Sequence, residues 1–100
     1  MEDLIKELKN LQYIISEIAQ NIKARSSSYQ DLEDLEAIEK SQFVDVPIIN
    51  KIKKLLELEK KITNNPNFSY SEKEIEEINN EIQEIQLYIN INFYQWLQFF

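Results

Sequence analysis

The side chains of this chain that could do chemistry are its carboxylates, most of which occur in two groups. Two carboxylates that face each other across a cleft can hydrolyse a glycosidic bond. Such a pair needs an apolar environment that raises the pKa of one member, and neither group has an evident one. We therefore expect the acids to act through their charge. The first group is Asp31, Glu33, Asp34, Glu36 and Glu39, and the second is Glu72, Glu74, Glu76, Glu77, Glu81 and Glu84.

The other residue types that usually carry chemistry are missing. Histidine and cysteine are absent, which excludes the usual zinc, haem and iron-sulfur ligands, the cysteine nucleophile and disulfides. A carboxylate di-metal site in a helical bundle would need a Glu-x-x-His pattern. Glycine is absent too, and phosphate-binding loops and EF-hands require it. We expect no catalytic residue, no metal and no cofactor, and hence a protein that is not an enzyme.

The elements that position these acids are predicted to be helices. Apolar residues recur at spacings of three and four between about residues 2 and 25, which is the period of one helical face. They are Leu4, Leu8, Leu11, Ile15, Ile18 and Ile22. Ile5 and Ile14 widen the stripe, so this helix should pack in a bundle.

Two shorter helices are expected in the middle of the chain, at about residues 28–40 and 47–63. Ser27 with Gln30 fits a capping box for the first of them. Asp45, before Val46 and Pro47, is a start signal for the second. The asparagine and proline residues at 64–67 should end it, because asparagine tolerates the left-handed conformation after a helix.

The last helix is expected at about residues 71–98. Ser71 and Glu74 form a capping box, and Tyr70 can pack on Ile75. The apolar period then continues through Ile75, Ile78, Ile82, Ile85, Ile89, Asn92, Trp96 and Phe99. Asn92 could fix the register of an assembly, although an asparagine near a wet helix end needs no such role. The alternation over residues 88–94 would also suit a strand, but no second strand is visible to pair with it.

The predicted fold is therefore all-α, a single domain over residues 1–100. Its simplest form is a four-helix antiparallel bundle with two long terminal helices and two shorter central ones. If the two central helices together make one broken arm, the result is a three-layered bundle instead.

The C-terminal segment carries no charge from Ile85 to Phe100, and most of its last residues are large and apolar. It is too short, and too often interrupted by Asn and Gln, to span a bilayer. Its apolar surface must be covered by the core, by a second copy or by a partner. The aromatic residues that we predict as interface candidates are Phe93, Trp96, Phe99 and Phe100.

Charge is segregated along the chain, whose net charge is −7. The acids are either a solvated face or a patch that docks on a basic surface of another protein. The candidates for such a patch are Asp31, Glu33, Asp34 and Glu36. Lysines concentrate in the third predicted helix and should compensate the acidic helices. Direct nucleic-acid binding is not expected, because the chain is acidic and has a single arginine, Arg25.

These features predict a cytoplasmic, non-enzymatic protein-binding module. Its size, acidity and AT-rich residue usage are typical of a small inhibitor or immunity-type protein, encoded by a phage or mobile element, that occupies a surface of a larger protein. The alternatives are a homo-oligomeric helical assembly joined by the C-terminal segment, and an obligate subunit of a hetero-complex.

Overall fold

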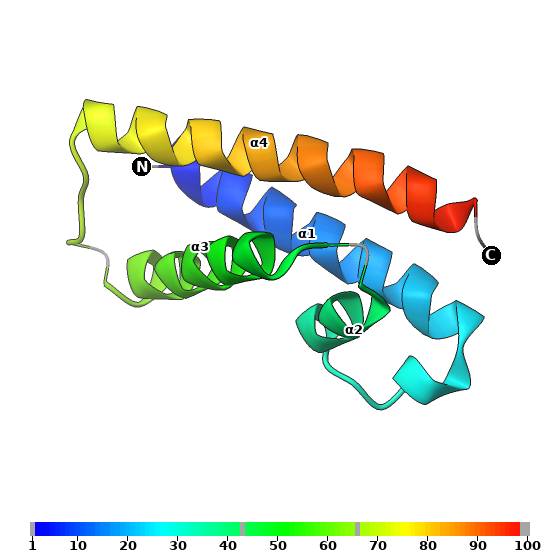
Figure 1. Ribbon diagram of the computed structural model, residues 1–100. Coiled ribbons are helices and arrows are strands. Elements are labelled where there is room, and N and C mark those ends of the chain that lie inside the picture. Colours follow the sequence, from blue (N-terminus) through cyan, green and yellow to red (C-terminus); the bar gives the residue numbers. More distant parts are fainter. Residues whose placement is uncertain (1, 43, 66, 99–100) are drawn as a thin grey trace.

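The computed structural model describes residues 2–42, 44–65 and 67–98, with the side chain of Trp96 excepted (Figure 1). Over these ranges the chain forms four α-helices and one short 3-10 turn, with no strand. The predicted all-α four-helix bundle is confirmed.

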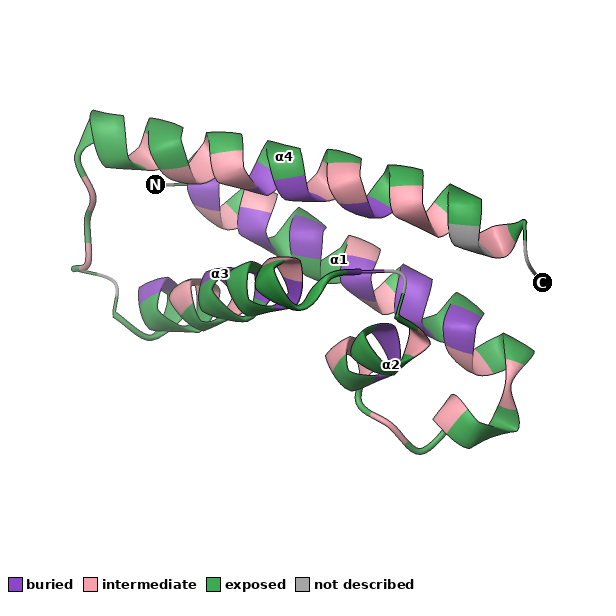
Figure 2. Ribbon diagram, viewed as in Figure 1, coloured by how far each residue is buried: buried purple, intermediate pink, exposed green. Residues whose placement is uncertain are grey.

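Helix α1 (Glu2–Arg25) is the centre of the bundle, because it contacts each of the other three helices. Its predicted apolar stripe is buried along the whole length of the helix (Figure 2). The buried residues are Leu4, Leu8, Leu11, Ile15, Ile18, Ala19 and Ile22. Their spacing of three and four residues keeps one face turned inward for the full length of the helix.

The predicted helix at residues 28–40 was wrong in its first half. Ser27–Tyr29 form a single 3-10 turn, and helix α2 (Asp34–Ser41) begins six residues later than expected. The hydroxyls of Ser26 and Ser28 share a hydrogen bond of 2.8 Å, and no side chain caps the turn. The predicted capping box therefore does not form. Glu33 is the N-cap residue of α2, which buries Ala37 and Ile38.

Helix α2 ends on a residue in the left-handed conformation, Gln42, with φ of 64°. Glycine usually occupies this position because it has no Cβ to clash with the backbone. The chain contains no glycine, so a glutamine takes the left-handed conformation at some cost in backbone energy.

Helix α3 (Val46–Asn64) starts as predicted, with Asp45 as its N-cap and Pro47 in the first turn. Its end differs from the prediction in one respect. Asn65 is the C-cap but has φ of −132°, so it is not left-handed. Instead the Oδ1 atom of Asn65 accepts a hydrogen bond of 3.3 Å from the Asn67 backbone N–H. The buried residues of α3 are Ile49, Ile52, Leu55 and Ile62.

Helix α4 (Glu72–Leu97) begins with the predicted capping box. The Ser71 N–H donates to Oε1 of Glu74, and the Glu74 N–H donates to Oγ of Ser71, both at 3.2 Å. The helix runs without interruption through residues 88–94, so that segment is not a strand. Asn92 donates its Nδ2 hydrogen to the Tyr88 carbonyl oxygen at 2.7 Å. This bond stays within α4.

The helices are arranged so that α1 and α4 run in the same direction, while α3 runs antiparallel to both (Figure 1). Helix α2 precedes α3 in the chain and packs mainly against α1. The core includes Ile82, Ile85 and Ile89 of α4 and residues of all the other helices. The molecule is elongated, with dimensions of 44 × 25 × 19 Å.

Candidate protein-interaction surfaces

The acidic residues predicted as a docking patch lie around the start of α2, and they do not all face solvent. Asp31 and Glu33 are exposed and precede the helix. Asp34 is half-buried, and its Oδ1 accepts a hydrogen bond of 2.9 Å from the Lys23 ammonium of α1. The Lys23 side chain is only 15% exposed, so this ion pair fastens α2 to α1.

The other acids of α2 are paired more loosely. Glu36 lies 3.7 Å from Lys40 on the same helix, and Glu39 lies 3.7 Å from Lys53 of α3. All four side chains are more than 40% exposed, and ion pairs of this kind contribute little to stability. Part of the α2 charge is thus compensated within the molecule, as the sequence predicted for the lysines of α3.

The acids of α4 are not compensated in this way. In the part of the chain that the structure describes, none of them forms an ion pair with a lysine or arginine. All six lie in the N-terminal half of the helix, between Glu72 and Glu84. The N-terminal half of α4 is therefore negative, and its C-terminal half has no charge.

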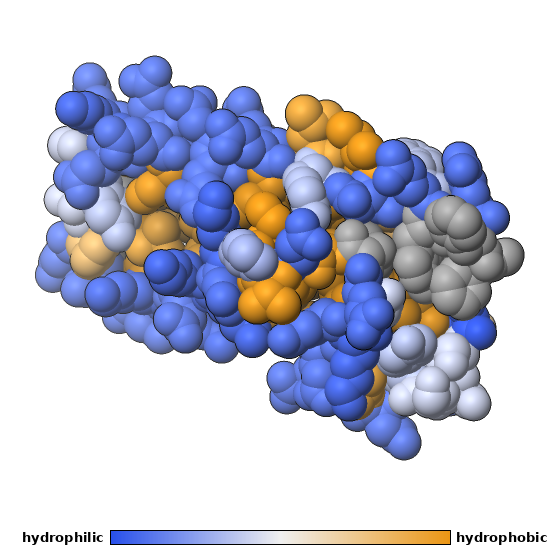
Figure 3. All heavy atoms as spheres, in the orientation of Figure 1, coloured by the Kyte–Doolittle hydropathy of each residue, from blue (hydrophilic) through white to orange (hydrophobic). Residues whose placement is uncertain are grey.

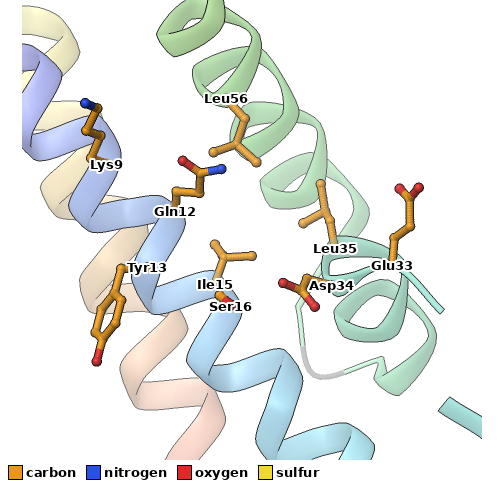
Figure 4. Close-up of a pocket in the computed structure, with 9 residues that line it drawn as sticks. All are labelled: Lys9, Gln12, Tyr13, Ile15, Ser16, Glu33, Asp34, Leu35 and Leu56. Carbon is orange, nitrogen blue, oxygen red and sulfur yellow. The ribbon is translucent and has the colours of Figure 1, made fainter. Parts of the chain in front are cut away.

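A groove of about 760 Å³ separates α1 from the start of α2 and from α3 (Figure 4). Its floor is apolar and consists of Ile15, Leu35 and Leu56. Asp34 points into the groove, where it is already paired with Lys23, whereas Glu33 points away. Glu33 and Asp34 both line the groove, but their carboxylates point apart.

Two tyrosines have perturbed hydroxyls, each with an acid beside it. The pKa of Tyr13 is raised above 10.0 mainly by its hydrogen bond of 2.8 Å to Oε1 of Glu17. Burial raises the pKa of Tyr88, and the Asp45 carboxylate adds to this effect. The Tyr88 hydroxyl also accepts a hydrogen bond of 3.4 Å from the Asp45 N–H, which links α4 to the start of α3. Both hydroxyls are thus held in the protonated form, which suits a structural role.

The aromatic residues predicted as interface candidates differ in their surroundings and in how far the structure describes them. Phe93 is partly buried and packs against the core, so it is not a free anchor for a partner. Trp96 lies in α4, but its side chain is outside the described part of the chain, as are Phe99 and Phe100. Phe93 follows Ile89 by four residues, and this spacing could have assigned it to the core.

The exposed apolar residues of α4 are ones that the sequence analysis did not select. Leu87 is 63% exposed, Ile91 is 50% exposed and Tyr94 is 68% exposed. They are separated by four and three residues, so they lie on one face of α4, roughly opposite the buried Ile85. We call these three residues the outer stripe. Figure 3 shows hydrophobic residues at the surface over the C-terminal half of α4, whereas the surface over its N-terminal half is hydrophilic.

The described residues contain no group of three or more acids placed to hold a metal ion. None of the helices there has the combination of length and hydropathy that a membrane-spanning segment requires. No protein-family model, curated protein or solved structure matches the chain.

Proposed function

We propose that this chain is a non-enzymatic protein-binding module and that it binds through the outer stripe of α4. The observation that carries the proposal is the exposure of Leu87, Ile91 and Tyr94 on one helical face. Single exposed apolar residues are common on protein surfaces, but contiguous apolar patches often mark contact sites. A tyrosine and two aliphatic side chains in one stripe supply the kind of apolar contact that helices use to recognise one another.

The absence of a catalytic arrangement supports the same function. The groove between α1, α2 and α3 holds one carboxylate that points inward, and Lys23 already neutralises it. The chain has neither histidine nor cysteine to supply a general base or a nucleophile near neutral pH. Binding requires none of these groups.

The function can take two forms. In the first, the chain is a small acidic inhibitor or immunity-type protein, of phage or mobile-element origin, that acts in the cytoplasm on a larger protein. The exposed Asp31 and Glu33 would then add electrostatic attraction for a basic surface. In the second form, the chain assembles with copies of itself. The position of the outer stripe on the uncharged half of α4 favours the second form, because charge attraction has no part in binding there.

Photo-crosslinking in the native host tests the proposal without knowledge of the partner. Benzoylphenylalanine replaces Tyr94 in one variant, and it replaces Tyr13, a similarly exposed tyrosine of α1, in the control (68% and 61% exposed). We expect a covalent adduct to a protein, either the same chain or another, from position 94 and none from position 13. An adduct from position 13 alone would move the binding surface to the groove. No adduct from either position would refute the proposed function.

A further inference from the structure

We infer that the occupant of the outer stripe is a second copy of this chain, packed antiparallel to the first across α4. This inference rests on the proposed function and names the partner of the same surface. The three exposed side chains of the stripe sit at intervals of four and three residues, which is the seam spacing of two helices packed side by side. Two identical stripes related by a two-fold axis are complementary to each other by construction.

The charge distribution of α4 favours a second copy over other occupants. A partner drawn by charge would dock on the acidic half of the helix, between Glu72 and Glu84, and not on the uncharged half. A helix that lies on a membrane surface usually carries Lys and Arg beside its apolar stripe. Helix α4 has one lysine, Lys73, at its opposite end. Two copies of a chain with a net charge of −7 repel each other least where neither carries charge.

The direction of pairing follows from the same distribution. With Ile91 near the two-fold axis of an antiparallel pair, Leu87 faces Tyr94 of the second copy, and Glu84 faces the uncharged Gln98 of the second copy. A parallel pair in register would instead bring Glu84, which lies three residues before Leu87 on the same side of α4, close to its own equivalent, and like charges repel at short distance. Antiparallel packing therefore joins the stripes and separates the acidic halves.

The size of the stripe predicts a weak pairing. Three side chains of this exposure offer on the order of 350 Å² per copy, or about 700 Å² for a pair, because a large apolar side chain carries roughly 150 to 250 Å². A stable interface usually buries about 1,200 Å² or more. We expect a dimer with a dissociation constant between about 10 µM and 1 mM, which forms and separates with concentration.

Sedimentation equilibrium of the purified full chain tests this inference, with variants that introduce opposite charges on the two sides of the proposed interface. For the wild type, the mean mass should rise from 12.0 kDa toward twice that value as concentration increases. Leu87→Glu alone and Tyr94→Lys alone should each weaken association at least tenfold. An equimolar mixture of these two variants should associate several-fold more tightly than either one, since the new carboxylate and the new ammonium face each other in the antiparallel pair. Asn10→Glu, an exposed position on α1, adds the same charge elsewhere and should have no effect.

Four results would overturn the inference. A wild type that is still monomeric at about 1 mM would exclude the second copy, because even the weakest dissociation constant that we expect would leave roughly half of the chains paired at that concentration. If the position-94 crosslinker then captured another protein, the proposed function would still hold. If Leu87→Glu associates as tightly as the wild type, the interface lies elsewhere. If the mixture of Leu87→Glu and Tyr94→Lys associates no more tightly than either variant alone, antiparallel pairing is excluded. If the wild type does not form a dimer but floats with phosphatidylcholine vesicles, and Leu87→Glu does not float, the occupant of the stripe is a membrane surface.

Discussion

The ion pair between Lys23 and Asp34 should contribute measurably to stability, because it joins α1 to the first turn of α2 with one partner mostly removed from water. The perturbation is a double-mutant cycle of Asp34→Ala and Lys23→Met. At 2.9 Å the Coulomb attraction lies between roughly 1.4 and 6 kcal/mol for effective dielectric constants of 80 and 20. Asp34 is 36% exposed, so solvent screening and the entropy of holding the side chains reduce this to a coupling of about 1 kcal/mol.

The chain provides a matched control in the same helix. Glu36 and Lys40 are 3.7 Å apart, and their side chains are 49% and 58% exposed. Pairs of this kind, four residues apart on a helix surface, contribute about 0.3 to 0.5 kcal/mol. The cycle of Glu36→Ala and Lys40→Ala should therefore give less than half the coupling of the first pair, and salt should abolish it. The first coupling should persist in about 0.5 M salt, because partly buried pairs are screened less.

Urea unfolding followed by far-UV circular dichroism measures both cycles. The single variant Asp34→Ala should lower the free energy of unfolding by about 1 to 2 kcal/mol, because it leaves the Lys23 ammonium partly buried without its partner. Equal couplings for the two pairs, or a coupling below about 0.3 kcal/mol for Lys23 and Asp34, would refute the reasoning. Asp34 would then belong to the docking patch that the sequence predicted, and not to the structural framework.

Three further predictions concern the core, the end of α2 and alkaline pH. Ile85→Ala should lower the free energy of unfolding by about 2 to 5 kcal/mol, because the Ile85 side chain is only 2% exposed. Leu87→Ala, two positions away, should change it by less than about 0.5 kcal/mol, because Leu87 is 63% exposed. Similar losses for the two variants in urea titrations would contradict the burial pattern. Gln42→Gly should stabilise the fold by about 0.5 to 1 kcal/mol by relieving the left-handed backbone, and a raised urea midpoint with an unchanged slope is the expected sign. The raised pKa of Tyr13 means that its hydrogen bond to Glu17 stabilises the fold fully below about pH 10, and that this stabilisation is lost as pH rises through the folded pKa. Subtracting the 295 nm absorbance titration of Tyr13→Phe from that of the wild type should give the titration of Tyr13, with a midpoint above 10.0. A midpoint at or below 10.0 would disprove the hydrogen bond.

Most of the fold could be predicted from the apolar period of the sequence, because long amphipathic helices have one face to bury. The predicted stripes of α1 and α4 correspond closely to the buried residues, and the capping box at Ser71 and Glu74 forms with both of its hydrogen bonds. The start of α2 could not be predicted in the same way. Ser26, Ser27 and Ser28 each fit a helix start, but Ser26 and Ser28 bond to each other and the chain makes a 3-10 turn.

The outer stripe that we propose as the binding surface was not among the residues selected from the sequence, for a geometric reason. A helix that carries apolar residues at most positions can turn only one stripe toward the core, and the rest must face outward. The whole uncharged C-terminal segment was expected to be covered, and its aromatic residues were selected as interface candidates. One of them, Phe93, packs against the core, whereas Leu87 and Ile91, which were not selected, are exposed. The period that places Ile82, Ile85 and Ile89 inside also places the outer stripe outside.

The measurement that tests the central claim most directly is the concentration dependence of the amide resonances of the wild-type chain. Spectra of ¹⁵N-labelled protein at roughly 50 µM and 1 mM span the range over which a weak pair forms. If the outer stripe joins two copies of the chain, the amide resonances of Leu87, Ile91 and Tyr94 will shift with concentration, and those of Gln12 and Ser16 in the groove will not. Shifts confined to the groove residues, or no shift at any residue, would contradict the account.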